Sequence, residues 1–344
     1  MAELLSSHPI IDPRYEDCGE VIAGRIDTSH GVVSYLSMGD RDAGKEYFVN
    51  GGLGSGCEYF YPARAIVRAG LGRVTMLRHS SVGASPGTIL DKDADEVAET
   101  IMVLNKRGAP ISLVNHSKGT KVGLLTVPKL PDSLDVQEVL EFNPVIGTSL
   151  NRGNIMRRAR SLPQVLVESM YSTVRHPMRM RRSQHGTQWE MFNRAGPILS
   201  ESYALILAGK DIRKPDLEAV RNRKNIGRTL IIAAYGSKDK ITQATDIERG
   251  IEEHGLDFDA TIKLDQKGFR GHLDLISNPA VVLAITSFSG VMLKAVRTSD
   301  REQVLEAEVD LYEELPEEVK TVEVDLKLPA QRTRKSKSVR KIAA

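Results

Sequence analysis

The feature that most constrains this chain is an alternation of short strand-like runs and longer helix-like runs between residues 46 and 127. β-branched and apolar residues favour a strand at three places, and a helix-compatible run follows each of them. Parallel strands need a crossover of about a dozen residues, which a helix usually supplies. We therefore expect an α/β fold with a mostly parallel central sheet flanked by helices. The predicted strands are Glu46–Val49, Arg73–Leu77 and Ile111–Val114, and the predicted helices are Tyr59–Ala69, Asp91–Asn105 and Thr120–Val127.

The same pattern extends on both sides of this region. Glu20–Asp27 and Gly31–Met38 are separated by turn residues and predict a hairpin. Late in the chain, two further strands are predicted at Thr229–Ala234 and Ala260–Leu264, and two further helices at Thr242–His254 and Asn278–Leu293.

Between the two sheet-forming parts, the strand pattern breaks from about Pro131. Residues 151–200 contain nine arginines, no lysine, two acidic residues and five methionines. Methionine adapts to irregular apolar shapes, so this composition suits a helical layer that closes over a ligand. We expect residues 131–224 to form an Arg- and Met-rich helical cap on a core made of residues 20–130 and 225–298.

The two ends of the chain are expected to lie outside that core. Residues 1–19 are interpreted as an N-terminal extension. Residues 299–344 are strongly charged, with eleven acids from Asp300 to Lys327 and six basic residues from Gln331 to Ala344. A segment of this kind is typical of a flexible, solvated tail, here with one short strand at Thr321–Leu328.

Composition excludes several classes of protein. The net charge of +2 gives no general attraction to nucleic acid, and aromatic residues are scarce near the basic segments. The N-terminus lacks the pattern of a secretory signal, and the apolar run Pro279–Leu293 is too short to span a membrane. Cys18 and Cys57 form no ligand pattern. We expect a cytoplasmic protein without a metal or cofactor; the oligomeric state stays open.

Ser117 is the candidate for chemistry. It stands between the strand that ends at Val114 and the following helix, with Gly119 two residues later. A serine at the crest of a strand–turn–helix with small neighbours is the arrangement of a nucleophile elbow. A serine nucleophile also needs a base, a group that orients the base, and donors for the oxyanion. Three loops that follow predicted strands supply candidates, namely Asn50–Gly54, Gly236–Asp239 and Gly271–His272.

With these motifs the chain resembles the α/β-hydrolase family from about Glu20 to Lys294. The order of Ser117, Asp239 and His272 is the family's order, with spacings of 122 and 33 residues. The resemblance implies that Ser117 attacks the acyl carbon, that His272 is the base and that Asp239 orients it. It also implies an oxyanion hole made by the backbone N–H groups of Gly52 and Lys118.

Three residues of the elbow depart from the family pattern. Asn115 replaces a glycine, Thr120 stands where a second small residue is common, and Lys118 replaces an uncharged residue. Lys118 either points into the pocket, where it would favour an anionic substrate, or is solvated. Neighbouring His116 is interpreted as a packing residue rather than a base, and Cys57 as structural.

Three functions stay open at this level. The first is a serine hydrolase that cleaves a carboxylic ester, with an apolar acyl part, through an acyl-enzyme on Ser117. The second is an acyltransferase or thioesterase that uses the same triad. The third is a catalytically silent α/β-hydrolase fold that binds a ligand or partner.

Overall fold

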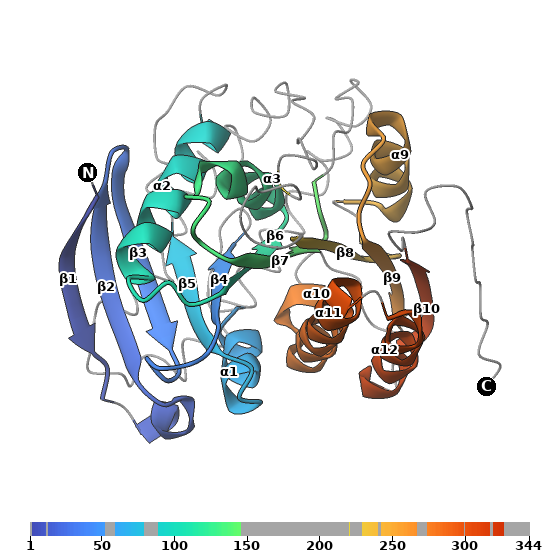
Figure 1. Cartoon of the computed structure of the whole chain (residues 1–344), viewed down its shortest axis with the longest axis horizontal. Helices are drawn as coiled ribbons and strands as arrows, with labels where there is room; N and C mark the ends of the chain where they lie inside the picture. The colour runs from blue at the N-terminus through green and yellow to red at the C-terminus, as the bar shows by residue number, and fades with distance from the viewer. Residues whose placement is uncertain are drawn as a thin grey trace.

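The computed structural model describes residues 2–11, 13–51, 59–78, 89–145, 220, 229–239, 242–266, 274–298, 300–316 and 319–326. Within these residues, ten strands form one sheet in the order β1-β2-β3-β5-β4-β6-β7-β8-β9-β10 (Figure 1). The strands are β1 Glu3–Pro9, β2 Val21–Thr28, β3 Gly31–Met38, β4 Glu46–Asn50, β5 Arg73–Arg78, β6 Ile111–His116, β7 Val136–Phe142, β8 Leu230–Gly236, β9 Ala260–Gln266 and β10 Val319–Leu326.

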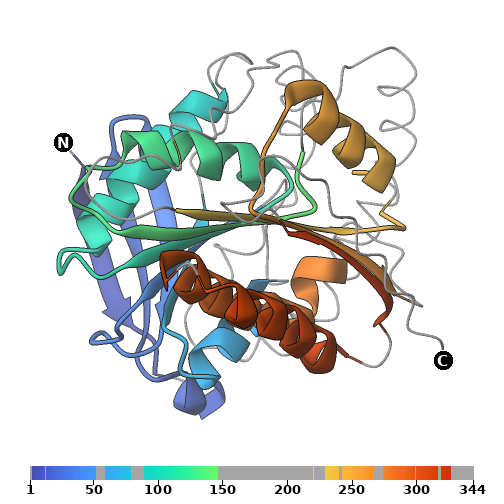
Figure 2. The same ribbon diagram turned by 45° about the vertical axis from the view of Figure 1, so that its right-hand side comes forward.

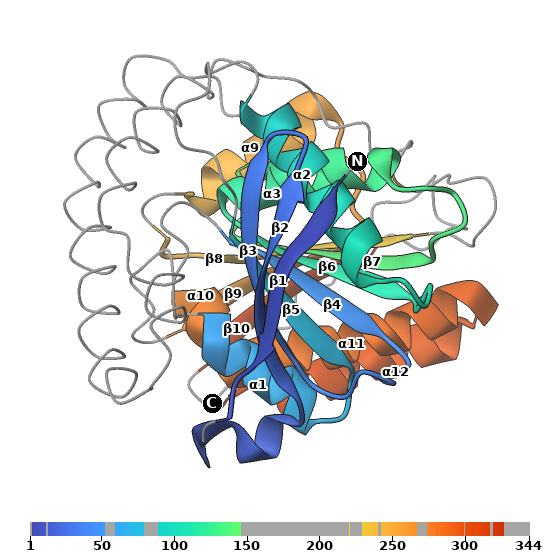
Figure 3. The same ribbon diagram turned by 90° about the vertical axis from the view of Figure 1, so that its left-hand side faces the viewer.

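The centre of the sheet is parallel. Neighbouring strands from β5 through β4, β6, β7 and β8 to β9 all pair in parallel. The first three strands and the last strand pair antiparallel with their neighbours. Figure 3 shows β1, β2 and β3 at one end of the sheet. The mostly parallel sheet expected from the sequence is confirmed.

Helices cover both faces of the sheet. Figure 2 shows α2, α3 and α9 over one face and α1, α10, α11 and α12 over the other. The α-helices of the described residues are α1 Phe60–Arg68, α2 Ile89–Leu104, α3 Lys118–Thr126, α9 Ala244–His254, α10 Asp274–Ser277, α11 Pro279–Thr298 and α12 Arg301–Glu314. Two short 3-10 helices, η1 Pro13–Cys18 and η3 Val127–Lys129, complete these elements.

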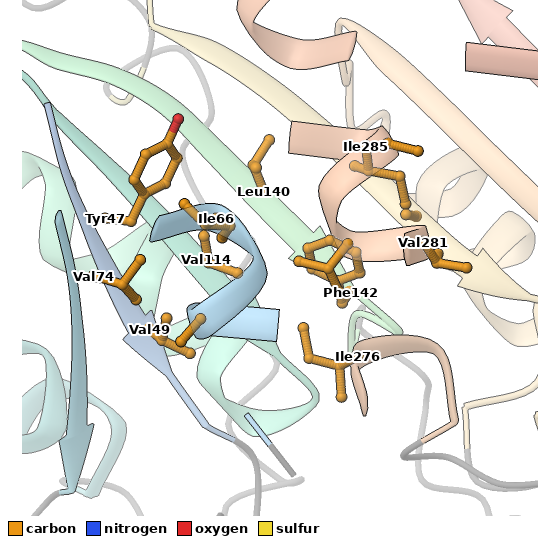
Figure 4. Close-up of a cluster of buried hydrophobic side chains, with 14 of the residues drawn as sticks. Tyr47, Val49, Ile66, Val74, Val114, Leu140, Phe142, Ile276, Val281 and Ile285 are labelled. Atoms are coloured by element: carbon orange, nitrogen blue, oxygen red, sulfur yellow. The ribbon is translucent and has the colours of Figure 1, made fainter. Parts of the chain in front are cut away.

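Two hydrophobic clusters lie on the two faces. Successive side chains of a strand point to opposite faces, so Leu113 joins the cluster under α2 and α3, whereas Val114 joins the one under α1 and α11. Figure 4 shows the second cluster, where Phe142 of β7 lies near Ile276 and Val281. Strands buried on both faces have few positions for polar residues, and this makes the polar residues they do carry informative.

Helix α11 is 20 residues long and apolar enough to span a membrane by length and composition. The helix extends five residues beyond the predicted end at Leu293. Ten of its residues are buried, and they pack in the core between the sheet, α1 and α12. A core helix of a globular domain has the same length and composition, and the packing of α11 is of that kind.

The structure confirms the elements predicted before residue 131, with boundaries that shift by a few residues. It corrects the predicted start of the cap. Val136–Phe142 is a buried strand in the middle of the sheet, between β6 and β8. Glu138 and Glu141 interrupt its apolar pattern although both are buried. Residues 146–219 and 221–228, which carry the rest of the predicted cap, lie outside the described residues.

Both chain ends also contribute to the fold. Residues 3–9 of the N-terminal extension form β1, which pairs with β2. The predicted flexible tail is wrong for residues 300–316 and 319–326, because α12 buries Val304, Ala307 and Leu311 and β10 pairs with β9. The short strand predicted at Thr321–Leu328 is confirmed as β10. Residues 327–344 lie outside the described residues.

Candidate active site

The carboxyl ends of the parallel strands meet at one edge of the sheet, and the candidate residues follow these ends. Ser117 comes directly after β6, and Asp239 comes three residues after the end of β8. In an open parallel sheet this edge is where ligands bind. His272, which follows β9 in the chain, and Gly52, which follows β4, both lie outside the described residues. The structure therefore describes the nucleophile and the acid of the predicted triad.

Ser117 has the backbone conformation of a sharp turn. Its φ of 54° and ψ of −117° are unfavourable for a residue with a side chain. Such a conformation costs about 1–3 kcal/mol and persists only where the surroundings enforce it. The amide of Ser117 donates to the carbonyl oxygen of Phe142 over 3.1 Å, and the amide of Thr120 donates to the carbonyl oxygen of Ser117 over 3.1 Å. These bonds hold the turn between β6 and α3.

Gly119 lets the turn approach the neighbouring strand. A β-carbon at this position would overlap the backbone of Asn50 and the carbonyl oxygen of Gly51. Backbone atoms at the end of β4 therefore leave no space for any other residue two positions after the serine. This contact is the physical reason why a small residue was expected two positions after the serine.

Asn115 is accommodated by a second glycine. Its side-chain amide lies against Gly123, where a β-carbon would overlap Nδ2, Cγ and Oδ1 of the asparagine. The side chain of Asn115 is fully buried, and its Oδ1 accepts a hydrogen bond of 2.7 Å from Nδ2 of Asn50. The departure from glycine at residue 115 is thus matched by a glycine one turn into α3.

Thr120 uses its hydroxyl at the elbow. Its Oγ1 donates to the carbonyl oxygen of Ser117 over 2.7 Å and accepts a hydrogen bond of 3.2 Å from the amide of Val145. The residue therefore connects the turn to the segment after β7, in addition to the bonds made by the backbone. This explains why a threonine stands where a smaller residue is common.

Lys118 is neither solvated nor free to face a pocket. Its Nζ lies 2.6 Å from Oδ2 of Asp93 on α2, and the side chain of Asp93 is completely buried. Both alternatives from the sequence are wrong, because a buried ion pair holds the side chain against α2. The backbone N–H of Lys118 is at the first position of α3, where helical N–H groups have no partner within the helix.

Asp239 is held in one orientation by Thr242. Its Oδ1 accepts from the amide of Thr242 over 3.1 Å, and its Oδ2 accepts from the hydroxyl of the same residue over 2.6 Å. Asp239 is 6% exposed. A buried carboxylate at a fixed orientation after β8 suits the role of a group that orients a histidine.

Asn143 was not predicted from the sequence. It follows β7 with a φ of 45°, and its Oδ1 accepts a hydrogen bond of 3.0 Å from the amide of Gly236. Its own amide donates to the carbonyl oxygen of Ala234 over 2.8 Å. The end of β7 therefore joins the turn at Ser117, through Phe142, to the loop that carries Asp239. The sequence carried no signal for it, because β7 itself was not predicted.

His116 packs beneath the elbow. Its Nδ1 lies 2.9 Å from the hydroxyl of Tyr59, and the two rings meet edge to face with centroids 5.9 Å apart. The ring is buried. The interpretation of His116 as a packing residue is confirmed. In the described part of the chain, no group of three His, Cys, Asp or Glu side chains is arranged to hold a metal ion.

No protein-family model matches this chain, and no curated protein matches it in sequence. Solved structures do match it. A structure from a study of carboxylesterases of the thaumarchaeon Nitrososphaera gargenis aligns with a TM-score of 0.53 and 15% identity, over 77% of this chain and 97% of its own. A lipase-esterase related protein from Clostridium acetobutylicum aligns with a TM-score of 0.50 and 15% identity, over 74% and 98% of the two chains. At such low identity, the likeness shows a shared fold.

Proposed function

We propose that this chain, which has the α/β-hydrolase fold, is a serine hydrolase that cleaves carboxylic esters through an acyl-enzyme on Ser117. The observation that carries the proposal is the conformation of Ser117. A buried serine with φ of 54° at the C-terminal edge of a parallel sheet is costly for the fold, and strain of this kind concentrates at functional sites.

The proposed reaction follows from the roles of three side chains. The hydroxyl of Ser117 attacks the ester carbonyl carbon while His272 takes its proton, and Asp239 stabilises the imidazolium that forms. The proton then passes to the leaving alkoxide as the carbon–oxygen bond breaks. Water enters by the same route, with His272 again as the base, and releases the carboxylic acid and the free serine.

The charge that develops on the carbonyl oxygen needs donors. The backbone N–H groups of Lys118 and Gly52 are proposed for this role, and one such donor typically lowers the barrier by about 3–4 kcal/mol. The first turn of α3 adds positive potential at the same position. Because the side chain of Lys118 is paired with Asp93, its charge is not proposed to select anionic substrates.

Two observations favour an active enzyme over a silent fold. Asn115 and Lys118 were the features that pointed to a silent fold. The first is accommodated by Gly123, and the second is paired away from the turn, so neither blocks the elbow. The carboxylate of Asp239 is held at the same edge of the sheet as Ser117, where an orienting acid is expected.

A panel of nitrophenyl esters of increasing acyl length tests the proposal. We expect turnover by the wild type and only the rate of the blank for Ser117→Ala. Ser112→Ala is a matched control, because it makes the same change at a nearby buried serine, in β6, and is expected to retain turnover. Equal rates for wild type and Ser117→Ala would remove Ser117 as the nucleophile. Product analysis with competing alcohols and thiols separates a hydrolase from an acyltransferase or thioesterase.

A further inference from the structure

Three polar side chains form a row across the strands beneath the elbow. Asn50, Asn115 and Glu141 stand opposite one another on β4, β6 and β7. Nδ2 of Asn50 donates to Oδ1 of Asn115 over 2.7 Å, and Nδ2 of Asn115 donates to Oε1 of Glu141 over 2.9 Å. All three side chains are at most 1% exposed.

The row differs from the residues that precede it on the same face of the sheet. Two residues earlier on the same strands, the corresponding side chains are the apolar Phe48, Leu113 and Val139, which are fully buried. The sheet therefore packs well at this face without hydrogen bonds between side chains. The polar row also leaves Oδ1 of Asn50 and Oε2 of Glu141 buried without a hydrogen-bond partner among the described residues. Such a row is costly for stability and calls for another explanation.

Glu141 fixes the direction of the hydrogen bonds. Burial raises the pKa of its carboxyl group well above the ordinary value. Its Oε1 accepts from Asn115, and this requires the amide of Asn115 to turn its Nδ2 toward β7 and its Oδ1 toward β4. Oδ1 of Asn115 then needs a donor, so the amide of Asn50 turns its Nδ2 toward Asn115.

Asn50 is consequently held from two sides. Its side chain is bonded to Asn115, and its backbone carbonyl lies against Gly119 of the elbow. It is also the last residue of β4, two positions before Gly52. The row thus ends at the residue from which the proposed oxyanion loop starts.

We propose that Asn50, Asn115 and Glu141 are positioning residues that hold the start of the oxyanion loop in register with Ser117. This inference rests on the proposed function. Hydrogen bonds are directional, whereas apolar packing tolerates small slides, so a polar row sets the relative position of β4 and β6 more sharply than Phe48 and Leu113 do. The rate enhancement from oxyanion donors falls when the donors are displaced by about 1 Å, so small slides between the strands matter.

The test is the rate at which a fluorophosphonate probe labels the full-length protein. Ser117 attacks phosphorus, fluoride leaves as the phosphorus–oxygen bond forms, and the serine proton passes to the base, with negative charge on the phosphoryl oxygen. Asn115→Ala removes both hydrogen bonds of the row. We expect its second-order labelling rate to fall by about tenfold to a hundredfold, the effect of a small misplacement of reacting groups.

Two further variants keep the inference testable if Asn115→Ala does not fold. Glu141→Gln keeps an acceptor for Asn115 and is expected to label at a rate near that of the wild type. Glu141→Leu replaces the carboxyl group by an apolar side chain without an acceptor and is expected to label slowly. All rates are compared well below the melting temperature of each variant, so that loss of folded protein does not contribute.

Ser112→Ala is the control for a merely structural role. Its hydroxyl donates to Oε2 of Glu138 over 2.7 Å, so the variant also breaks a buried bond between β6 and β7, near the opposite end of the strands. We expect it to lose stability but to label at the wild-type rate. If Asn115→Ala and Glu141→Leu label as fast as Ser112→Ala, the positioning role is overturned while the proposed function stands. If the wild type itself is not labelled, both are overturned.

Discussion

The side-chain amide of Asn115 occupies the space that a β-carbon on Gly123 would need. In the interior of a helix, glycine is ordinarily less favourable than alanine by about 1 kcal/mol. Helix α3 accepts this cost at Gly123, and the buried amide beneath the elbow keeps its hydrogen bonds to Asn50 and Glu141. The two residues are therefore expected to tolerate substitution only together.

Gly123→Ala is predicted to destabilise the protein although it raises helix propensity. The new methyl group must displace a buried amide, and overpacking of this kind costs about 1–3 kcal/mol in the free energy of unfolding. Gly290→Ala in α11 is the matched control, because nothing lies within 4 Å of its β-carbon position and the residue is exposed. This control should gain up to about 1 kcal/mol. Urea denaturation measures both, and a gain in both variants would contradict the packing described.

Lys118→Met is predicted to cost about 3–5 kcal/mol of unfolding free energy, because it leaves the buried carboxylate of Asp93 without its cation. Adding Asp93→Leu should recover much of this loss, since an apolar pair replaces the ion pair. A double-mutant cycle in urea gives the coupling energy. Strictly additive losses would mean that the two side chains do not depend on each other.

Ser117→Gly is predicted to be more stable than Ser117→Ala. Glycine adopts the φ of 54° and ψ of −117° without strain, whereas alanine carries a β-carbon as serine does. Relief of about 1–3 kcal/mol exceeds the roughly 0.4–1 kcal/mol that glycine costs through the unfolded chain. Thermal unfolding of the two Ser117 variants compares them directly. A glycine variant that melts below the alanine variant would argue against strain at the turn.

Glu141→Gln is predicted to stabilise the protein increasingly as the pH rises. The folded state raises the pKa of Glu141, so above the ordinary value of about 4.5 it holds a proton that the unfolded state releases. The unfolding free energy of the wild type then falls by up to about 1.4 kcal/mol per pH unit until the folded-state pKa is reached. Glutamine does not titrate, so the difference between the two proteins should grow from acidic to neutral pH in urea titrations. A constant difference would show that Glu141 is ionised in the fold.

The parallel core was predictable because local pattern and tertiary position agree there. Apolar runs such as Ile111–Val114 are both strand-forming and buried, and the helix Asp91–Asn105 has one apolar face. The strand Val136–Phe142 was missed for the opposite reason. Two of its residues, Glu138 and Glu141, are charged in the sequence but buried in the sheet, where partners on β6 bond to them. Burial of this kind depends on contacts with a neighbouring strand.

The C-terminal segment was misjudged because charge dominates its composition. Helix α12 exposes its acidic residues and buries Val304, Ala307 and Leu311 at helical spacing. This narrow apolar face holds the helix in the fold only because it packs against α11. Asn143, which accepts a hydrogen bond from the amide of Gly236, was missed as well, because it follows the strand β7 that was not predicted.

The positions of Ser117 and Asp239 at one edge of the sheet could be predicted from the sequence because each follows a recognisable strand, and strand ends of a parallel sheet converge by topology. The row of Asn50, Asn115 and Glu141 could not, because it depends on the register of three strands that are 65 and 26 residues apart in the chain. Neighbours across a sheet are invisible to any pattern read along the sequence.

The most direct test of the account is the site of covalent labelling by a fluorophosphonate. Intact-mass measurement and peptide mapping of the wild type should give one phosphonyl adduct, on Ser117, and Ser117→Ala should give none at the same probe concentration. No adduct on a folded wild-type protein, or an adduct that persists in Ser117→Ala, would contradict the assignment of Ser117 as the nucleophile.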